Sequence, residues 1–283
     1  MFTLNCNGRL LFTDKPLVMG VINTTPDSFY EGSRRETVNA IVQQAESMLK
    51  LGADILDIGG QSTRPGSKPV GEEEELKRVL GGIAAIHDYF PEAIISIDTW
   101  HAKVAKEAVA AGAGIINDIS AGSLDKEMLS TVASLNVPYV LMHLQGTPLT
   151  MQQSPAYSNV TTEVLDFFIQ KTEQLKKAGI RDIIIDPGFG FGKTIAHNFE
   201  LLRNLSVFKI AGLPLLAGLS RKSTISKTLN STTQESLNGT TVMNTIALLN
   251  GADIIRVHDV KEAIEVVTLV EAYLQTSPTG NSH

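Results

Sequence analysis

The feature that most constrains how this chain folds is the recurrence of eight short apolar segments along its 283 residues. Most of them are rich in β-branched residues, and short runs of this kind predict buried strands rather than helices. In chain order they cover residues 17–22, 55–58, 94–97, 115–116, 139–142, 183–185, 215–217 and 254–257. The chain is therefore predicted to contain eight buried strands.

The stretches between these segments have the spacing of amphipathic helices. The clearest example follows the first segment, where apolar residues recur three and four positions apart between Val38 and Leu49. Gly52 is placed to end this helix, because glycine readily adopts the left-handed conformation found just after helix ends. The sequence thus predicts strands and helices in alternation.

A weak internal repeat supports this alternation. Glycine opens the second, fourth, sixth and eighth segments, at Gly52, Gly112, Gly179 and Gly251. Proline introduces the other four, at Pro16, Pro91, Pro138 and Pro214. Both residues end helices, so the chain is interpreted as four copies of a strand–helix–strand–helix unit.

Eight alternations within about 250 residues predict an α/β fold, a single closed (β/α)8 TIM barrel. An open doubly wound sheet is the main alternative, and the eightfold count disfavours it. No linker or change of composition divides the chain, so residues 1–283 are predicted to form one domain. The barrel is expected at residues 16–274, with a short N-terminal extension at 1–15 and a frayed tail at 275–283.

Composition disfavours several classes of function. The formal net charge of −6 is the opposite of the basic footprint of a nucleic-acid-binding protein. The single cysteine, Cys6, rules out a disulfide framework within the chain and suits a reducing compartment. We recognise neither a leader peptide nor a membrane-spanning run, so we expect a cytoplasmic protein with no nucleic-acid and no membrane partner.

The sixth segment leads into Asp186 and a loop of alternating glycines at Gly188, Gly190 and Gly192. This loop fits neither common nucleotide-binding motif. The first glycine that a P-loop requires falls on Pro187, and the spacing lacks the last step of the dinucleotide fingerprint. A carboxylate at the end of a buried strand still needs a partner, which is a helix N-terminus, a cation or a ligand.

Function in such barrels is located on the loops that follow the strands. The polar residues at or near these strand ends are Asn23, Asp57, Asp98, Asn117, His143, Asp186, Ser220, Arg256 and His258. Any one of them could simply cap the next helix. Their convergence on one rim instead predicts a binding site for a polar heterocycle held by hydrogen bonds.

Three loops at this rim narrow the chemistry. Residues 23–29 carry an aromatic tip, residues 59–66 carry one guanidinium, and residues 218–223 carry hydroxyls and cations. Hydroxyls and cations ahead of a helix form either a carboxylate or phosphate site, or an ordinary capped helix with solvated charges. The sequence alone leaves both interpretations of residues 218–223 open.

Six motifs in this chain resemble the dihydropteroate synthase family. They occupy residues 20–29, 57–66, 142–148, 186–193, 220–223 and 256–260. The resemblance covers nearly the whole barrel and implies an enzyme of folate biosynthesis. Such an enzyme joins 6-hydroxymethyl-7,8-dihydropterin diphosphate to p-aminobenzoate, releasing diphosphate and forming 7,8-dihydropteroate. The resemblance also implies a homodimer and a site that sulfonamides target.

Residue roles follow from the resemblance, position by position. The catalytic residues would be Asp57, Asp98, Lys222 and Arg256. The pterin diphosphate would contact Thr63, Asp98, Asn117, Met142, Asp186, Phe191, Lys222, Arg256, Val257 and His258. The p-aminobenzoate would contact Phe29, Arg64, Pro65 and Ser223. Asn23 would help to bind Mg²⁺, the one cofactor that the resemblance implies.

The implied mechanism is a substitution in which the diphosphate departs early. Asp57 and Asp98 would supply negative potential beside the positive charge that develops on the pterin. Mg²⁺ and Arg256 would stabilise the leaving group. No side chain needs to bond covalently to the substrate, so the absence of a Ser-His-Asp or Cys-His arrangement is expected.

Two positions depart from the family pattern. Gln61 stands where a glutamate is common and Leu144 where a methionine is common, and both bear on substrate affinity rather than on the activity. Three other functions remain as alternatives: a corrinoid-linked methyltransferase, a non-catalytic pterin-binding protein and an aldolase-type barrel. The motifs at 62–66 and 220–223 favour the synthase over the methyltransferase. The intact loops after the first and second strands favour it over the non-catalytic pterin-binding protein. An aldolase-type barrel requires a lysine that forms a Schiff base, and Lys222 is the one candidate at a strand end.

Overall fold

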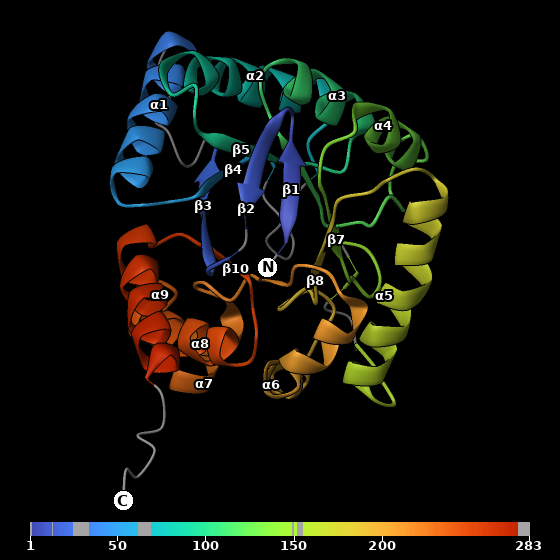
Figure 1. Cartoon of the computed structure of the whole chain (residues 1–283), viewed down its shortest axis with the longest axis vertical. Coiled ribbons are helices and arrows are strands. Elements are labelled where there is room, and N and C mark those ends of the chain that lie inside the picture. Colours follow the sequence, from blue (N-terminus) through green and yellow to red (C-terminus); the bar gives the residue numbers. More distant parts are fainter. Residues whose placement is uncertain are drawn as a thin grey trace, which may run out of the picture.

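Eight parallel strands form the centre of the molecule, and helices surround them (Figure 1). The computed structural model describes residues 2–12, 14–24, 34–61, 69–148, 150–151 and 155–276. The central strands are β3 (Leu17–Asn23), β4 (Ile55–Gly59), β5 (Ile94–Asp98), β6 (Ile115–Asp118), β7 (Tyr139–Met142), β8 (Ile183–Asp186), β9 (Leu216–Ala217) and β10 (Ile254–Val257). Each predicted apolar segment forms one of these strands, which confirms that prediction.

The sheet closes on itself. Neighbouring strands follow the order β8-β7-β6-β5-β4-β3-β10-β9, and every pair in this series is parallel. A parallel bridge between Ile185 and Leu215 joins the two ends of the series, and the Ile185 N–H donates to the carbonyl of Pro214 at 2.9 Å. The fold is therefore the predicted (β/α)8 barrel and not an open doubly wound sheet.

The helices form a ring around the strands (Figure 1). They are α1 (Arg34–Lys50), α2 (Glu72–Tyr89), α3 (Ala102–Ala110), α4 (Met128–Leu135), α5 (Val160–Lys177), α6 (Ile195–Arg203), α7 (Ser223–Leu229), α8 (Leu237–Leu249) and α9 (Val260–Gln275), with 3-10 segments η1 (Leu205–Ala211) and η2 (Gln234–Ser236). The glycine that opens each even-numbered segment has a positive φ, as at Gly52, where φ is 100°. The internal repeat is thus a repeat of helix ends.

A two-stranded hairpin precedes the barrel, where the sequence predicted only an extension. Strands β1 (Thr3–Cys6) and β2 (Arg9–Phe12) pair through a two-residue turn in which both Asn7 and Gly8 have positive φ. Asn-Gly is the strongest local signal for such a turn, so the sequence did contain this information. The hairpin lies across one end of the barrel (Figure 1), and Leu4 and Cys6 pack against the first residues of the central strands.

The barrel has two different ends, which we call the base and the mouth: the N-terminal and C-terminal ends of the strands, respectively. Side chains two residues apart on a strand share a face. Near the base the inward side chains are apolar and include Ile55 and Ile254, whereas the next inward positions on these strands are Asp57 and Arg256. An apolar layer at the base therefore supports a polar layer nearer the mouth.

Candidate active site at the barrel mouth

Four strands contribute to one hydrogen-bonded cluster inside the mouth. The guanidinium of Arg256, on β10, donates through Nε to Oδ2 of Asp57 at 2.6 Å and through Nη2 to Oδ2 of Asp98 at 2.7 Å. Asn117, on β6, donates through Nδ2 to the same Asp57 oxygen at 3.2 Å. Residues far apart in the sequence, on β4, β5, β6 and β10, thus meet at one point.

Asp57 is the most enclosed member of this cluster. It lies in the middle of β4 rather than at the strand end, and its side chain is fully buried. Its Oδ1 atom has no hydrogen-bond partner within the described part of the chain. A buried carboxylate oxygen without a donor is costly, so this atom is open to a donor from a bound ligand.

The cluster places one cation between two carboxylates. Burial raises the pKa of Asp98 to about 7, and the nearby Asp57 adds to this shift although Arg256 opposes it. Burial alone would disfavour the charged guanidinium, but the charges of Asp57 and Asp98 outweigh it and raise the pKa of Arg256. Arg256 therefore stays charged at any ordinary pH.

A second group of charges lies on the β8 and β9 side of the mouth. Asp186 is buried, and its Oδ1 accepts a hydrogen bond from the Gly188 N–H at 2.8 Å. Burial raises the pKa of Asp186, whereas Gly188 and the charge of Lys222 oppose this. Lys222 lies with Nζ 4.2 Å from the centre of the Phe191 ring, and burial together with Arg256 lowers its pKa to about 8.

An apolar wall adjoins these polar groups. It is a cluster separate from the main core, composed of Trp100, Ile119, Met142, Met151 and Phe191 with Leu144 packed against it. Met142 and Phe191 were predicted to contact the pterin and Leu144 to bear on substrate affinity, whereas the other three residues were not predicted. Two of them could have been found, because Trp100 and Ile119 each lie two residues beyond a selected polar residue, Asp98 and Asn117 respectively. A polar cluster beside an apolar wall suits a flat heterocycle.

The remaining predicted residues do not join this cluster: three lie at the rim, one packs in the core, and four lie outside the described residues. Asn23 ends β3 and is half-buried, Ser223 is the exposed first residue of α7, and His258 is exposed just after β10. The His258 N–H donates to Oγ of Ser220 at 3.2 Å. The side chain of Val257 packs in the core between strands and helices, so only its backbone can face a ligand. Phe29, Thr63, Arg64 and Pro65 lie outside the described residues.

A Mg²⁺ ion at this mouth would have few protein ligands. Among the described residues, no group of three or more His, Cys, Asp or Glu side chains is arranged to hold a metal. An ion would therefore depend on one or two protein oxygens, water and phosphate oxygens. Mg²⁺ is commonly bound in this way, and the half-buried amide of Asn23 fits such a role.

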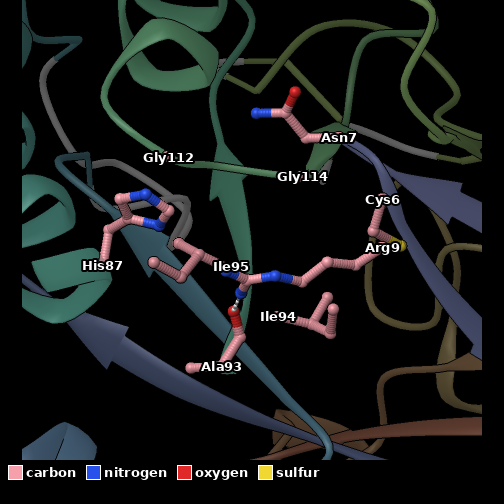
Figure 2. A pocket seen from close by; sticks show the side chains of 9 residues that line it. All are labelled: Cys6, Asn7, Arg9, His87, Ala93, Ile94, Ile95, Gly112 and Gly114. Carbon is pink, nitrogen blue, oxygen red and sulfur yellow. Dashed lines mark hydrogen bonds between the residues drawn. The ribbon is translucent and has the colours of Figure 1, made fainter. Parts of the chain in front are cut away.

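The cavity shown in Figure 2 is not a competing site for a heterocycle. It lies at the base, under the hairpin, and is lined by residues that include Cys6, Arg9 and His87. Arg9 donates to the carbonyl of Ala93 there at 3.0 Å. The cavity has a volume of about 30 Å³, which accommodates roughly one or two water molecules. The candidate site is the mouth, at the opposite end of the barrel.

Comparison with known proteins identifies the family of the chain. Residues 19–258 match the family described as pterin binding enzyme. The chain is 45% identical over 273 residues to the dihydropteroate synthase of Escherichia coli (strain K12), covering 96% of each chain. The crystal structure of the Yersinia pestis dihydropteroate synthase with a sulfonamide drug superimposes with a TM-score of 0.92 at 42% identity, covering 97% of this chain and 100% of that one.

A third relative shows a bound small molecule. It is the Xanthomonas albilineans dihydropteroate synthase with 4-aminobenzoic acid, which superimposes with a TM-score of 0.91 at 40% identity, covering 97% of this chain and 99% of that one.

Proposed function

The chain belongs to the pterin-binding enzyme family, among the dihydropteroate synthases, and from this premise we infer its reaction. It condenses 6-hydroxymethyl-7,8-dihydropterin diphosphate with p-aminobenzoate, giving 7,8-dihydropteroate and diphosphate in folate biosynthesis. It is therefore a transferase and a target for sulfonamides. The observation that carries this conclusion is the convergence of Asp57, Asp98, Asn117 and Arg256 at the mouth, with Asp186 and Lys222 beside them.

The pterin end of the site is proposed to act by shape and hydrogen bonding. Asp186 accepts from the amino group and ring N–H of the pterin, because a carboxylate can accept more bonds than the one from Gly188. Lys222 and Asn117 serve the ring carbonyl and ring nitrogen acceptors. Met142 and Phe191 cover the ring faces, together with Trp100 and Ile119 of the same cluster.

The chemical step is proposed to be charge separation followed by capture. The bond between the pterin methylene carbon and the diphosphate oxygen breaks, and positive charge spreads over the electron-rich dihydropterin. Asp57 and Asp98 stabilise this charge, while Arg256 and His258 contact the departing phosphate oxygens. The amine nitrogen of p-aminobenzoate then bonds to the methylene carbon and loses a proton. Positioning of the two substrates contributes most of the remaining effect.

The diphosphate end and the p-aminobenzoate end rest on rim residues. We propose that Asn23 helps to hold Mg²⁺, which would supply positive charge to the leaving diphosphate. Thr63 and the backbone of Val257 are proposed to contact the pterin diphosphate. Phe29, Arg64, Pro65 and Ser223 are proposed to form the p-aminobenzoate site. The start of α7 at Ser223 is consistent with this role, since a helix N-terminus favours a carboxylate.

A diphosphate-release assay tests the proposed function. Purified protein with the pterin diphosphate and Mg²⁺ should release diphosphate much faster when p-aminobenzoate is added, and dihydropteroate should accumulate in equal amount. A non-catalytic pterin-binding protein would bind the pterin but release nothing. Omission of Mg²⁺, by chelation with EDTA, should slow release, and an unchanged rate would reject Mg²⁺ dependence while leaving the reaction itself intact.

Assembly and location are further proposals. None of the described helices combines the length and the apolarity that crossing a membrane requires. We propose a homodimer, because α8 and α9 both expose large apolar side chains. We propose a cytoplasmic location, because the buried thiol of Cys6 is unpaired and suits a reducing compartment.

A further inference from the structure

Lys193 is a buried lysine that the proposed reaction does not use. Its side chain is 3% exposed, and Nζ lies at hydrogen-bond distance from four acceptors. These are the Nδ1 atom of His143 at 3.0 Å and the carbonyls of His143 at 3.2 Å, Gly188 at 3.0 Å and Phe191 at 2.9 Å. No carboxylate is among them, so carbonyl dipoles and a ring nitrogen surround the charge.

The glycine loop, residues 187–192, is shaped around this ammonium. Its three glycines all have positive φ, and at Gly188 a Cβ atom would lie 2.1 Å from the carbonyl oxygen of His143. Only glycine allows this approach of the loop to the end of β7. Three carbonyls that point at one place repel one another, and a cation between them removes that repulsion. The ammonium thus joins the loop to β7.

The glycine loop also sets the geometry of the pterin site. The Gly188 N–H donates to Oδ1 of Asp186, and Phe191 supplies both a carbonyl to Lys193 and the ring over which Lys222 lies. Any shift of the loop therefore moves the Phe191 ring and changes the contacts that Asp186 and Lys222 make with the loop.

Building on the proposed function, we propose that Lys193 is a positioning residue for the pterin. Its ammonium holds the glycine loop against β7, so that Asp186 and Phe191 keep the arrangement that a pterin ring requires. Its ammonium is occupied by acceptors of the loop and of His143, so the residue is proposed to touch neither substrate. Removal of the ammonium should therefore weaken pterin binding without directly affecting the p-aminobenzoate site.

The test compares Lys193→Met with Lys209→Met. Lys209 also hydrogen-bonds through its ammonium, to Asp253 at 2.7 Å, but it lies near the base, so it controls for loss of one charge. Isothermal titration with the pterin diphosphate and Mg²⁺ gives affinity, and steady-state kinetics give KM for each substrate. We expect Lys193→Met to raise the pterin Kd about 10- to 100-fold, by analogy with the loss of residues that orient metal-ligating side chains. The p-aminobenzoate KM at saturating pterin should stay within about two-fold, and Lys209→Met should change neither value.

Several outcomes would overturn the proposal. An unchanged pterin Kd in folded Lys193→Met rejects it, and so does an equal rise in both KM values, which would indicate general loosening. If Lys193→Met does not fold, Lys193→Gln, which keeps N–H donors without the charge, is tested in the same way. If neither variant folds, Lys193 is a structural residue and the proposal is wrong. A wild-type protein that does not bind pterin diphosphate would reject the proposed function instead, before any variant is compared.

Discussion

At the scale of single residues, the polar side chains selected from strand ends lie together at the mouth, because closure of a parallel barrel brings strand ends to one rim. The predicted strand at residues 55–58 already contained Asp57, but the sequence could not show that one of its oxygens lacks a partner, since that depends on the stagger of β4 against its neighbours. The sequence also could not show that Val257 faces the outer core.

Substitution of Asp186 tests the proposed pterin anchor. Asp186→Asn replaces a charged acceptor by an amide of the same shape. We expect the pterin Kd to rise about 100-fold or more, because hydrogen bonds to a charged group are worth roughly 1.5–3 kcal/mol each, and the amide removes the charge from both bonds and one acceptor oxygen. Isothermal titration measures this.

The matched control is Asp182→Asn, just before the same strand. Asp182 accepts from the Asn5 N–H at the base of the barrel, far from the mouth, and the substitution should leave the pterin Kd unchanged. Retention of micromolar pterin affinity by Asp186→Asn would show that another residue anchors the ring.

At the scale of elements, most boundaries of helices and strands could be predicted from the sequence, because nearby residues determine them. Apolar runs marked the strands, and glycine marked helix ends such as that at Gly52. The hairpin of β1 and β2 was not predicted although its Asn7-Gly8 turn is a strong signal, because the four residues on each side are too few for a clear alternation of apolar and polar positions. Burial of Glu75 could not be foreseen either. It depends on how α2 packs against the barrel beside Gln61.

The hairpin turn gives a clean test of backbone strain. Gly8 has φ of 88° and an added Cβ would meet nothing within 4 Å, so Gly8→Ala changes only conformational energy. We expect the free energy of unfolding to fall by about 1 kcal/mol, measured by denaturant titration. Turnover should not change, because the hairpin lies at the base. Gly71→Ala is the control: Gly71 also has open space but φ of −69°, so no loss is expected.

Burial of Glu75 should make the stability of the protein depend on pH. Its side chain is fully buried on α2, with Oε2 accepting from Nε2 of Gln61 at 2.7 Å and Oε1 unpartnered among the described residues. Burial raises its pKa from 4.5 to about 7. A raised pKa means that the folded state holds the proton more tightly than the unfolded chain does. The contribution of Glu75 to stability is therefore complete below pH 4.5 and is lost as pH rises through 7.

The isosteric variant Glu75→Gln should remove this dependence. At pH 8 it should be more stable than the wild type by up to about 3 kcal/mol, and at pH 5.5 by about 1 kcal/mol. Thermal or denaturant unfolding at the two pH values measures the difference. Glu74→Gln, on the exposed side of the same helix, should give no such trend. A variant less stable than the wild type at pH 8 would mean that Glu75 is ionised and well paired in the folded state.

At the scale of the whole molecule, the arrangement of two ends explains how one fold separates stability from function. The base is apolar and closed by the hairpin, whereas the mouth carries buried charges that are individually unfavourable. Helix α9 also has two different faces. Val266, Val267 and Val270 pack in the core. The sequence alone could not say whether the other apolar residues of this helix face the core or a partner.

The structure places those remaining residues on the outside. Leu269 and Tyr273, four residues apart on one face of α9, are 71% and 67% exposed. Helix α8, which packs against α9, also exposes Val242 and Leu249, and exposed apolar side chains on both helices favour a surface covered by a second copy. We therefore expect the wild-type protein to sediment at micromolar concentration with twice the chain mass of 30.5 kDa.

Leu269→Glu combined with Tyr273→Glu should convert this dimer to a monomer, because a symmetric interface would bury each new charge twice without a partner. Analytical ultracentrifugation measures the mass, and Ile169→Glu, an equally drastic change at an isolated exposed residue of α5, should leave the dimer intact. The active site is built from one chain within the described residues, so the monomer should keep its pterin affinity. A wild-type monomer would reject the homodimer, whereas a double variant that remains dimeric would locate the interface on another face.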